Sequence, residues 1–241
     1  MQLSLVGLTG WDETVSPKDV VSFLEKYPYA AAGIHFSEER RGEKRHPREP
    51  WVQELETEVK KLTMTTPYPL HLDAHLGNKW SLQVASGDTD ILGDVIDLTI
   101  FQRIQLNHIG KAQPQAFLEG IQHFPNTTFI VSRSRTTEEF CAAVDKLVTE
   151  QGITNVSFLF DSSWGQGETP EAWPEVSEGT PCGYAGGLGP DNLSAELEKL
   201  KETSKGQEVW VDMESKLRSK SDLFSVGRCE QCMTQARKYL P

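Results

Sequence analysis

The chain has 241 residues, which is the size of one large α/β domain or two small ones. Hydrophobic residues make up 37% of the sequence, which is enough for a core and excludes a disordered chain. The formal net charge of −11 argues against binding to nucleic acid or to an anionic membrane surface. Because no apolar run approaches the ~20 residues of a membrane span and the start lacks a basic signal-peptide region, we predict a cytoplasmic protein.

Short apolar runs alternate with longer amphipathic stretches along the chain. The predicted strands are 3–8, 31–36, 69–74, 103–107, 128–132, 156–160, 182–186 and 209–213. Their near-continuous apolar character is typical of strands that are buried on both faces. The predicted helices are 16–27, 49–62, 113–124, 136–152 and 190–202, whereas 80–97 is less clear because two glycines interrupt it.

Two of the predicted helices have an end that is marked by residues typical of helix caps. Ser16 and Pro17 suit the N-cap and the first helical position of one helix, and Gly152 suits the C-terminal cap of another. Alternating strands and helices imply parallel pairing, and eight such units in ~250 residues indicate a (β/α)8 TIM barrel. The main alternative is a doubly wound open sheet. No linker divides the chain, so we predict a single barrel domain over residues 1–241.

In a (β/α)8 barrel, chemistry takes place at the carboxyl ends of the strands. The polar residues that we expect there are Asp73, His75, Asn107, Arg133, Asp161 and Asp212. The charged loop 37–50 carries Arg40 and Arg41, one of which we predict to clamp an anionic substrate, although a solvated surface loop would also explain the charges. Gly186 and Gly187 precede a helix and suit a phosphate site, although a tight turn that needs positive φ would also explain them.

Three segments carry a resemblance to a known family: FDSSWGQGETPEAW, GYAGGLGPDNL and VWVDMESKLRSKSDLFSVGRC. Together they resemble the C-terminal half of phosphoribosylanthranilate isomerase, over roughly residues 155–240. The resemblance implies a (β/α)8 barrel related to tryptophan biosynthesis. It also implies an aldose-to-ketose rearrangement of a phosphorylated sugar derivative, with no metal or organic cofactor.

The resemblance also implies roles for individual residues. Asp161 matches the family's general acid, which protonates the sugar ring oxygen. Asp212 matches an acid that contacts the substrate. Gly186 and Gly187 match one half of the phosphate cradle, and Ser215 falls in the other half.

Two departures from the family pattern indicate a changed activity. The family's general base is a cysteine before the glycine of the first strand, whereas Val6 stands there in this chain and cannot accept a proton. Glu214 brings a negative charge towards a bound phosphate unless Lys216 or Arg218 offsets it. We therefore expect Asp73 or His75 to supply the base.

A metal-dependent lyase, epimerase or hydrolase is the first alternative. Side chains alternate along a strand, so His71, Asp73 and His75 share one face, where Asp161, Asp212 or His35 would complete a ligand set. The cysteine pair Cys229–Cys232 lacks the second pair that a zinc site needs, and we expect reduced thiols.

A barrel that binds a ligand or partner without catalysis is the second alternative, with its mouth blocked by Glu214 or Trp164. We favour an isomerase-like enzyme that transfers a proton on a small anionic substrate, without cofactor, as a monomer or homodimer.

Overall fold

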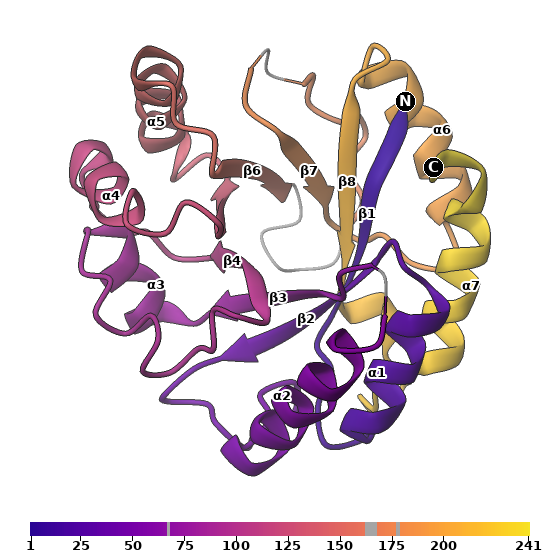
Figure 1. Ribbon diagram of the computed structural model, residues 1–241. Coiled ribbons are helices and arrows are strands. Elements are labelled where there is room, and N and C mark those ends of the chain that lie inside the picture. The colour runs from indigo at the N-terminus through magenta and orange to yellow at the C-terminus, as the bar shows by residue number, and fades with distance from the viewer. Residues whose placement is uncertain (67, 162–167, 177–178) are drawn as a thin grey trace.

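Eight parallel strands close into one barrel in chain order in a computed structural model (Figure 1), which describes all residues except 67, 162–167 and 177–178. The strands are β1 (Gln2–Thr9), β2 (Ala30–Phe36), β3 (His71–Leu76), β4 (Phe101–Leu106), β5 (Thr128–Arg133), β6 (Val156–Asp161), β7 (Cys182–Ala185) and β8 (Glu208–Met213). All eight predicted strands are confirmed. Because β8 pairs with β1, the open-sheet alternative is wrong.

The helices surround the barrel (Figure 1). They are α1 (Pro17–Lys26), α2 (Glu49–Thr63), α3 (Asn78–Ala85), α4 (Pro114–Ile121), α5 (Glu138–Gln151), α6 (Leu193–Thr203) and α7 (Val226–Ala236), with short 3-10 turns η1 (Ser215–Leu217) and η2 (Arg237–Tyr239). The Ser16 side chain accepts the N–H of Asp19 and Pro17 opens α1, as predicted. Gly152 ends α5 at φ 67°, in the left-handed region that favours glycine.

The segment 80–97, which the sequence left unclear, contains the end of α3 and a turn-rich connection to β4. Gly87 follows the helix at φ 87°. A left-handed residue at this place stops the helix, which explains why the helical pattern does not continue.

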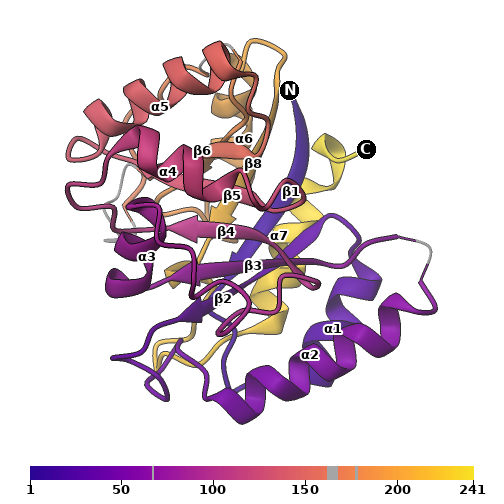
Figure 2. The ribbon, with the colours of Figure 1, turned by 60° about the vertical axis from the view of Figure 1, so that its left-hand side comes forward.

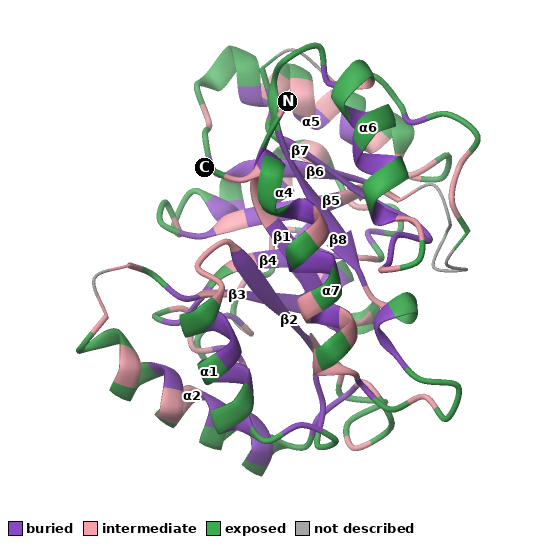
Figure 3. Ribbon diagram, turned by 90° about the vertical axis from the view of Figure 1, so that its right-hand side faces the viewer, coloured by how far each residue is buried: buried purple, intermediate pink, exposed green. Residues whose placement is uncertain are grey.

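Most of the core lies between the strands and the helices. Figure 3 shows buried strands and helices that are buried on their inner faces and exposed on their outer faces. A smaller apolar cluster inside the barrel joins Ile130, Leu159, Ala185 and Trp210. None of the helices in the described chain is long and apolar enough to cross a membrane.

The helices do not form a continuous packed ring. α1 packs against α2 and α3 packs against α4, whereas α2 and α3 stand apart (Figure 2). A cavity of about 720 Å³ lies beside them, lined by residues of α2, of the β2–α2 loop and of the segment 93–99. This cavity forms a groove in the barrel wall that reaches His35 at the end of β2 and Trp80 of α3.

Candidate active site at the barrel mouth

The inward side chains form stacked rings at the carboxyl ends of the strands. In a barrel the strands are tilted, so alternate strands supply one ring. The strand register gives an outer ring of His35, Asn107, Asp161 and Glu214, a second ring of Thr9, His75, Ser132 and Ala185, and a third ring of Gly33, Gln105, Leu159 and Asp212. Five of the predicted site residues thus face one interior: Asp161 and Asn107 outermost, then His75, Asp212 and, below them, Asp73.

A hydroxyl joins two of these residues. Thr9 Oγ1 donates a hydrogen bond to Asp212 Oδ1 at 2.8 Å, and the same oxygen lies 3.3 Å from His75 Nε2. The three side chains are almost fully buried, with exposed fractions of 1% for Thr9, 2% for His75 and 6% for Asp212. The sequence placed Thr9 at a strand end but did not indicate its contact with Asp212, a residue 203 positions away.

Burial shifts the pKa values of these two titratable groups in opposite directions on the pH scale. It raises the pKa of Asp212 to about 8, an effect that the charges of Asp73 and Glu214 increase and the Thr9 hydrogen bond opposes. Burial also holds the pKa of His75 well below its ordinary value of 6.5, and the neighbouring charge of His35 adds to this. At neutral pH the carboxyl therefore keeps its proton and the imidazole is neutral.

Asp73 lies deeper and pairs with Arg103, a residue of β4 that the sequence did not single out. Arg103 Nη1 is 3.4 Å from Asp73 Oδ2, and the guanidinium carbon lies 4.2 Å from the centre of the Trp210 ring. Burial raises the pKa of Asp73, and Arg103 acts in the opposite direction. Within the described residues Asp73 Oδ1 and both Arg103 Nη atoms have no hydrogen-bond partner, so this deep pair suits structural or solvent contacts more than a base at the mouth.

Glu214 in the outer ring pairs with Arg45 of the loop after β2 and lies beside His35 at the end of β2. Arg45 Nη1 donates to Glu214 Oε1 at 2.8 Å, and His35 Nε2 lies 3.5 Å from the same oxygen. Although burial acts to raise the pKa of Glu214, His35 and Arg45 hold it far below its ordinary value. Arg45, and not Lys216 or Arg218 as expected, thus offsets this charge.

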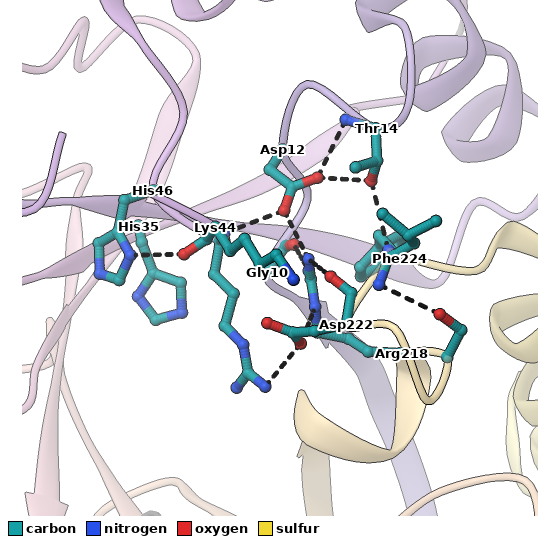
Figure 4. A network of polar contacts seen from close by, with 12 residues as sticks. Gly10, Asp12, Thr14, His35, Lys44, His46, Arg218, Asp222 and Phe224 are labelled. Atoms are coloured by element: carbon teal, nitrogen blue, oxygen red, sulfur yellow. Dashed lines mark hydrogen bonds and ion pairs between the residues drawn. The ribbon is translucent and has the colours of Figure 1, made fainter. Parts of the chain in front are cut away.

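Arg218 instead forms hydrogen bonds with the loop after β1 and with Asp222, as Figure 4 shows. Its guanidinium donates to Asp12 Oδ2 and to the Gly10 carbonyl, both at 2.6 Å, and to Asp222 Oδ1 at 2.7 Å. Arg45 joins the same network, because its backbone N–H donates to Asp12 and its guanidinium to Asp222. The loops after β1, β2 and β8 are therefore tied together beside the mouth.

Two predicted arginines lie away from the barrel interior. Arg133 was predicted to bind substrate, but strand alternation turns Ser132 inward and Arg133 outward. The Arg133 guanidinium lies 5.6 Å and 5.5 Å from the rings of Phe158 and Phe160 and bonds both carboxylate oxygens of Glu138. These contacts lie on the outer side of β5, and a role of Arg133 towards substrate stays a prediction.

Arg41 is exposed and lines the groove beside α2. Its Nη1 donates to Glu49 Oε2 at 3.0 Å. A ligand that occupies this groove would meet it. Asn107 lies nearer the interior, where its Oδ1 accepts from Gln105 Nε2 at 2.7 Å.

The glycine turn after β7 is held by Asn192. Gly186 and Gly187 have φ values of 119° and 60°, which confirms a tight turn that needs positive φ. Asn192 donates to the Gly187 carbonyl at 2.9 Å and accepts from the Gly189 N–H at 2.9 Å. The exposed Ser215 accepts from Arg45 Nη1 at 3.3 Å. Asn192 thus fixes both sides of the turn by hydrogen bonds, and the role of the turn towards phosphate stays a prediction.

The remaining expectations concern Val6, a metal and the segment after β6. Val6 is buried in the outer core and alternates with Gly7, so its side chain does not face the interior. Across residues 1–66, 68–161, 168–176 and 179–241, no group of three His, Cys, Asp or Glu side chains is arranged to hold a metal ion. Trp164, expected to block the mouth, lies outside the described residues.

Comparison with solved structures supports the fold. Phosphoribosyl anthranilate isomerase from Thermus thermophilus superimposes with a TM-score of 0.59 at 14% identity, covering 97% of this chain and 98% of that one. TrpF from Jonesia denitrificans gives 0.55 at 15% identity, with 98% and 97% covered. A phospho-2-dehydro-3-deoxyheptonate aldolase from Thermotoga maritima gives 0.54 at 12%, with 98% and 68% covered. No family model and no curated protein matches the sequence.

The chain therefore has the TIM-barrel fold of phosphoribosyl anthranilate isomerase. Identities of 14% and 15% establish the fold alone, and function has to be argued from the site itself.

Proposed function

We propose that the protein is an isomerase-like enzyme that moves a proton on a phosphorylated sugar or a related small anion, using its own side chains as acid and base. The observation that carries this proposal is the buried contact chain of Asp212, Thr9 and His75 at the mouth of the barrel. A protonated carboxyl and a neutral imidazole side by side are the two partners that acid/base catalysis needs.

His75 is a better base than Asp73 in this arrangement. It lies in the second ring, whereas Asp73 lies lower and is engaged with Arg103. Because burial lowers the pKa of His75, the imidazole is neutral at neutral pH, and it gains access to a free ring nitrogen through the state of Asp212 and Thr9. Burial raises the pKa of Asp73, which keeps that group protonated more of the time.

The acid is Asp161 or Asp212, according to the step. Asp161 ends β6 in the outer ring, where an entering sugar would pass first, and there it would protonate the ring oxygen. Asp212 lies beneath it in the third ring and holds a proton up to about pH 8. One acid for ring opening and a separate acid–base pair for the carbon-bound proton would together complete an aldose-to-ketose conversion.

Two features support an anionic substrate. The glycine turn at Gly186 and Gly187 lies between β7 and α6, where barrels often bind phosphate. Arg45 pairs with Glu214, which offsets the repulsion that this carboxylate would exert on an anion. The solved isomerase of the same fold is named for a phosphoribosyl compound. The likeness of fold raises the expectation of a phosphorylated substrate without establishing it.

The first experiment measures exchange of solvent deuterium into a panel of phosphorylated aldoses and ketoses by NMR. The wild-type chain is expected to catalyse exchange at the carbon next to the carbonyl. His75→Gln is expected to lower the rate at least ~100-fold, the usual contribution of a positioned base. His71→Gln is the matched control, because His71 lies on the same strand at its opposite end.

The possible outcomes of this experiment distinguish the proposed function from its alternatives. Exchange that is lost in His75→Gln and kept in His71→Gln supports the proposal. Equal loss in both variants removes His75 as the base. Exchange that disappears on chelation of divalent cations would favour the metal-dependent alternative, and no exchange with any member of the panel would overturn the proposed function.

A further inference from the structure

The Thr9 hydroxyl can link two titrating groups because of its bonding capacity. A hydroxyl carries one proton and two lone pairs, so it donates to one neighbour while it accepts from another. Its oxygen lies 2.8 Å from Asp212 Oδ1 and 3.3 Å from His75 Nε2. With both neighbours buried, the protonation of one decides which way the hydroxyl points towards the other.

Two arrangements of protons fit this contact. With Asp212 ionised, Thr9 donates to the carboxylate and accepts from the Nε2–H of His75. With the proton on Asp212 Oδ1, the carboxyl donates to Thr9, and Thr9 donates to a bare Nε2, so the imidazole proton lies on Nδ1. The state of Asp212 therefore selects the tautomer of His75.

We propose that the Thr9 hydroxyl is a proton relay that couples Asp212 to His75 and so positions the acid–base pair. In the transfer step the Asp212 proton moves to Thr9 Oγ1 while the Thr9 hydroxyl proton moves to His75 Nε2. Asp212 becomes a carboxylate, His75 becomes an imidazolium and Thr9 is unchanged. The reverse movement restores the starting state. This role deepens the proposed function and rests on it for its catalytic meaning.

Two glycines create the space for the relay. A Cβ on Gly33 would lie 2.1 Å from Thr9 Oγ1 and 2.9 Å from His75 Nε2. A Cβ on Gly7 would lie 2.4 Å from Asp212 Oδ1. Since real Cβ atoms do not approach other atoms so closely, any side chain at either position would push the three partners apart. The contact of Thr9, His75 and Asp212 therefore depends on glycine at both positions, on β1 and on β2.

Other charged groups face the pair and set its background. His35 on β2 lies beside His75, with ring centres 5.4 Å apart. Arg103 on β4, Asp73 on β3 and Glu214 after β8 also act on the pKa values of the two groups. These groups act through space, whereas Thr9 is in direct contact with both partners. Removing its hydroxyl is therefore expected to separate the two titrations and leave the through-space effects in place.

The test is NMR of the protein with 15N-labelled histidine, because the two ring nitrogens report the tautomer directly. In the wild-type chain the His75 tautomer is expected to change from Nδ1–H to Nε2–H as the pH passes about 8, where Asp212 ionises. Thr9→Ser keeps the hydroxyl and is expected to keep this change. Thr9→Val has a similar shape without the hydroxyl and is expected to abolish it.

A tautomer change that persists in folded Thr9→Val would overturn the relay. A wild-type His75 that keeps one tautomer across the whole titration would also overturn it, without need of any variant. Asp212→Asn adds an internal check, because its His75 should show no change near that pH. None of these readings uses turnover, so failure of the substrate panel and failure of the relay are distinguishable.

Once a substrate is known, kinetics gives an independent reading. Thr9→Val is expected to lower kcat at least about tenfold with little change in KM, since the relay acts in the chemical step. Thr9→Ser is expected to stay within about threefold of the wild-type kcat. A loss confined to KM would contradict a relay and indicate a binding role.

Discussion

Replacing Asp212 with Asn tests whether this carboxyl is protonated in the folded chain. Burial raises its pKa to about 8, whereas an Asp in an unfolded chain titrates near ~3.9. Between these values the folded chain holds a proton that the unfolded chain releases, so the free energy of unfolding falls as the pH rises. The contribution is fully present below about pH 4, falls by about 1.4 kcal/mol per pH unit and is lost above about pH 8.

The useful window is pH 6.5 to 8, in which Asp212 is expected to lower the free energy of unfolding by about 2 kcal/mol. Below this window the lowered pKa values of His46, His71 and His75 act with the opposite sign. Urea denaturation followed by circular dichroism measures the free energy at several pH values. Asp212→Asn is expected to be less pH-dependent than the wild type by this amount.

Asp94→Asn is the matched control, because the same change at an exposed position should leave the pH dependence as it is in the wild type. If Asp212→Asn and the wild type lose stability in parallel between pH 6.5 and 8, the carboxyl is ionised throughout. The acid role and the relay would then both fail.

Two further predictions concern stability. Arg218→Met leaves the buried Asp12 without its guanidinium partner and is expected to cost about 3–5 kcal/mol of unfolding free energy in urea; a cost below about 1 kcal/mol would show that the pair is dispensable. Gly183→Ala places a Cβ 2.2 Å from the Trp210 ring and is expected to cost about 1–3 kcal/mol. In the same assay Gly227→Ala, in open space within α7, should stabilise by up to about 1 kcal/mol; equal effects at the two glycines would contradict the packing of Trp210.

The fold was predictable because its signals are local. Apolar runs mark strands that are buried on both faces, and Ser16, Pro17 and Gly152 mark helix ends through bonds within a few residues. The segment before β4 was the exception. Gly87 and Gly93 interrupt the helical pattern of this segment, and the pattern does not indicate whether the helix lies before or after them.

The site was predictable only in part, because strand alternation fixes which side chains face inward but not whom they meet. Asp73, His75 and Asp212 follow from the rule that barrel chemistry lies at strand ends. Arg45 does not, since it reaches Glu214 from a loop 169 positions away. The sequence favoured Arg41 in the same loop, and nothing local distinguishes the two arginines before the loop has folded.

The network around Arg218 has a consequence for redesign of this barrel. The fold is usually regarded as modular, with loops that can be exchanged one at a time on a constant frame. Here one buried guanidinium holds the loops after β1 and β8, and Arg45 adds the loop after β2. If one loop were replaced alone, charged side chains in the other two loops would lose their ion-pair partners. Loop exchange on this side of the barrel would have to transfer all three loops as one cassette.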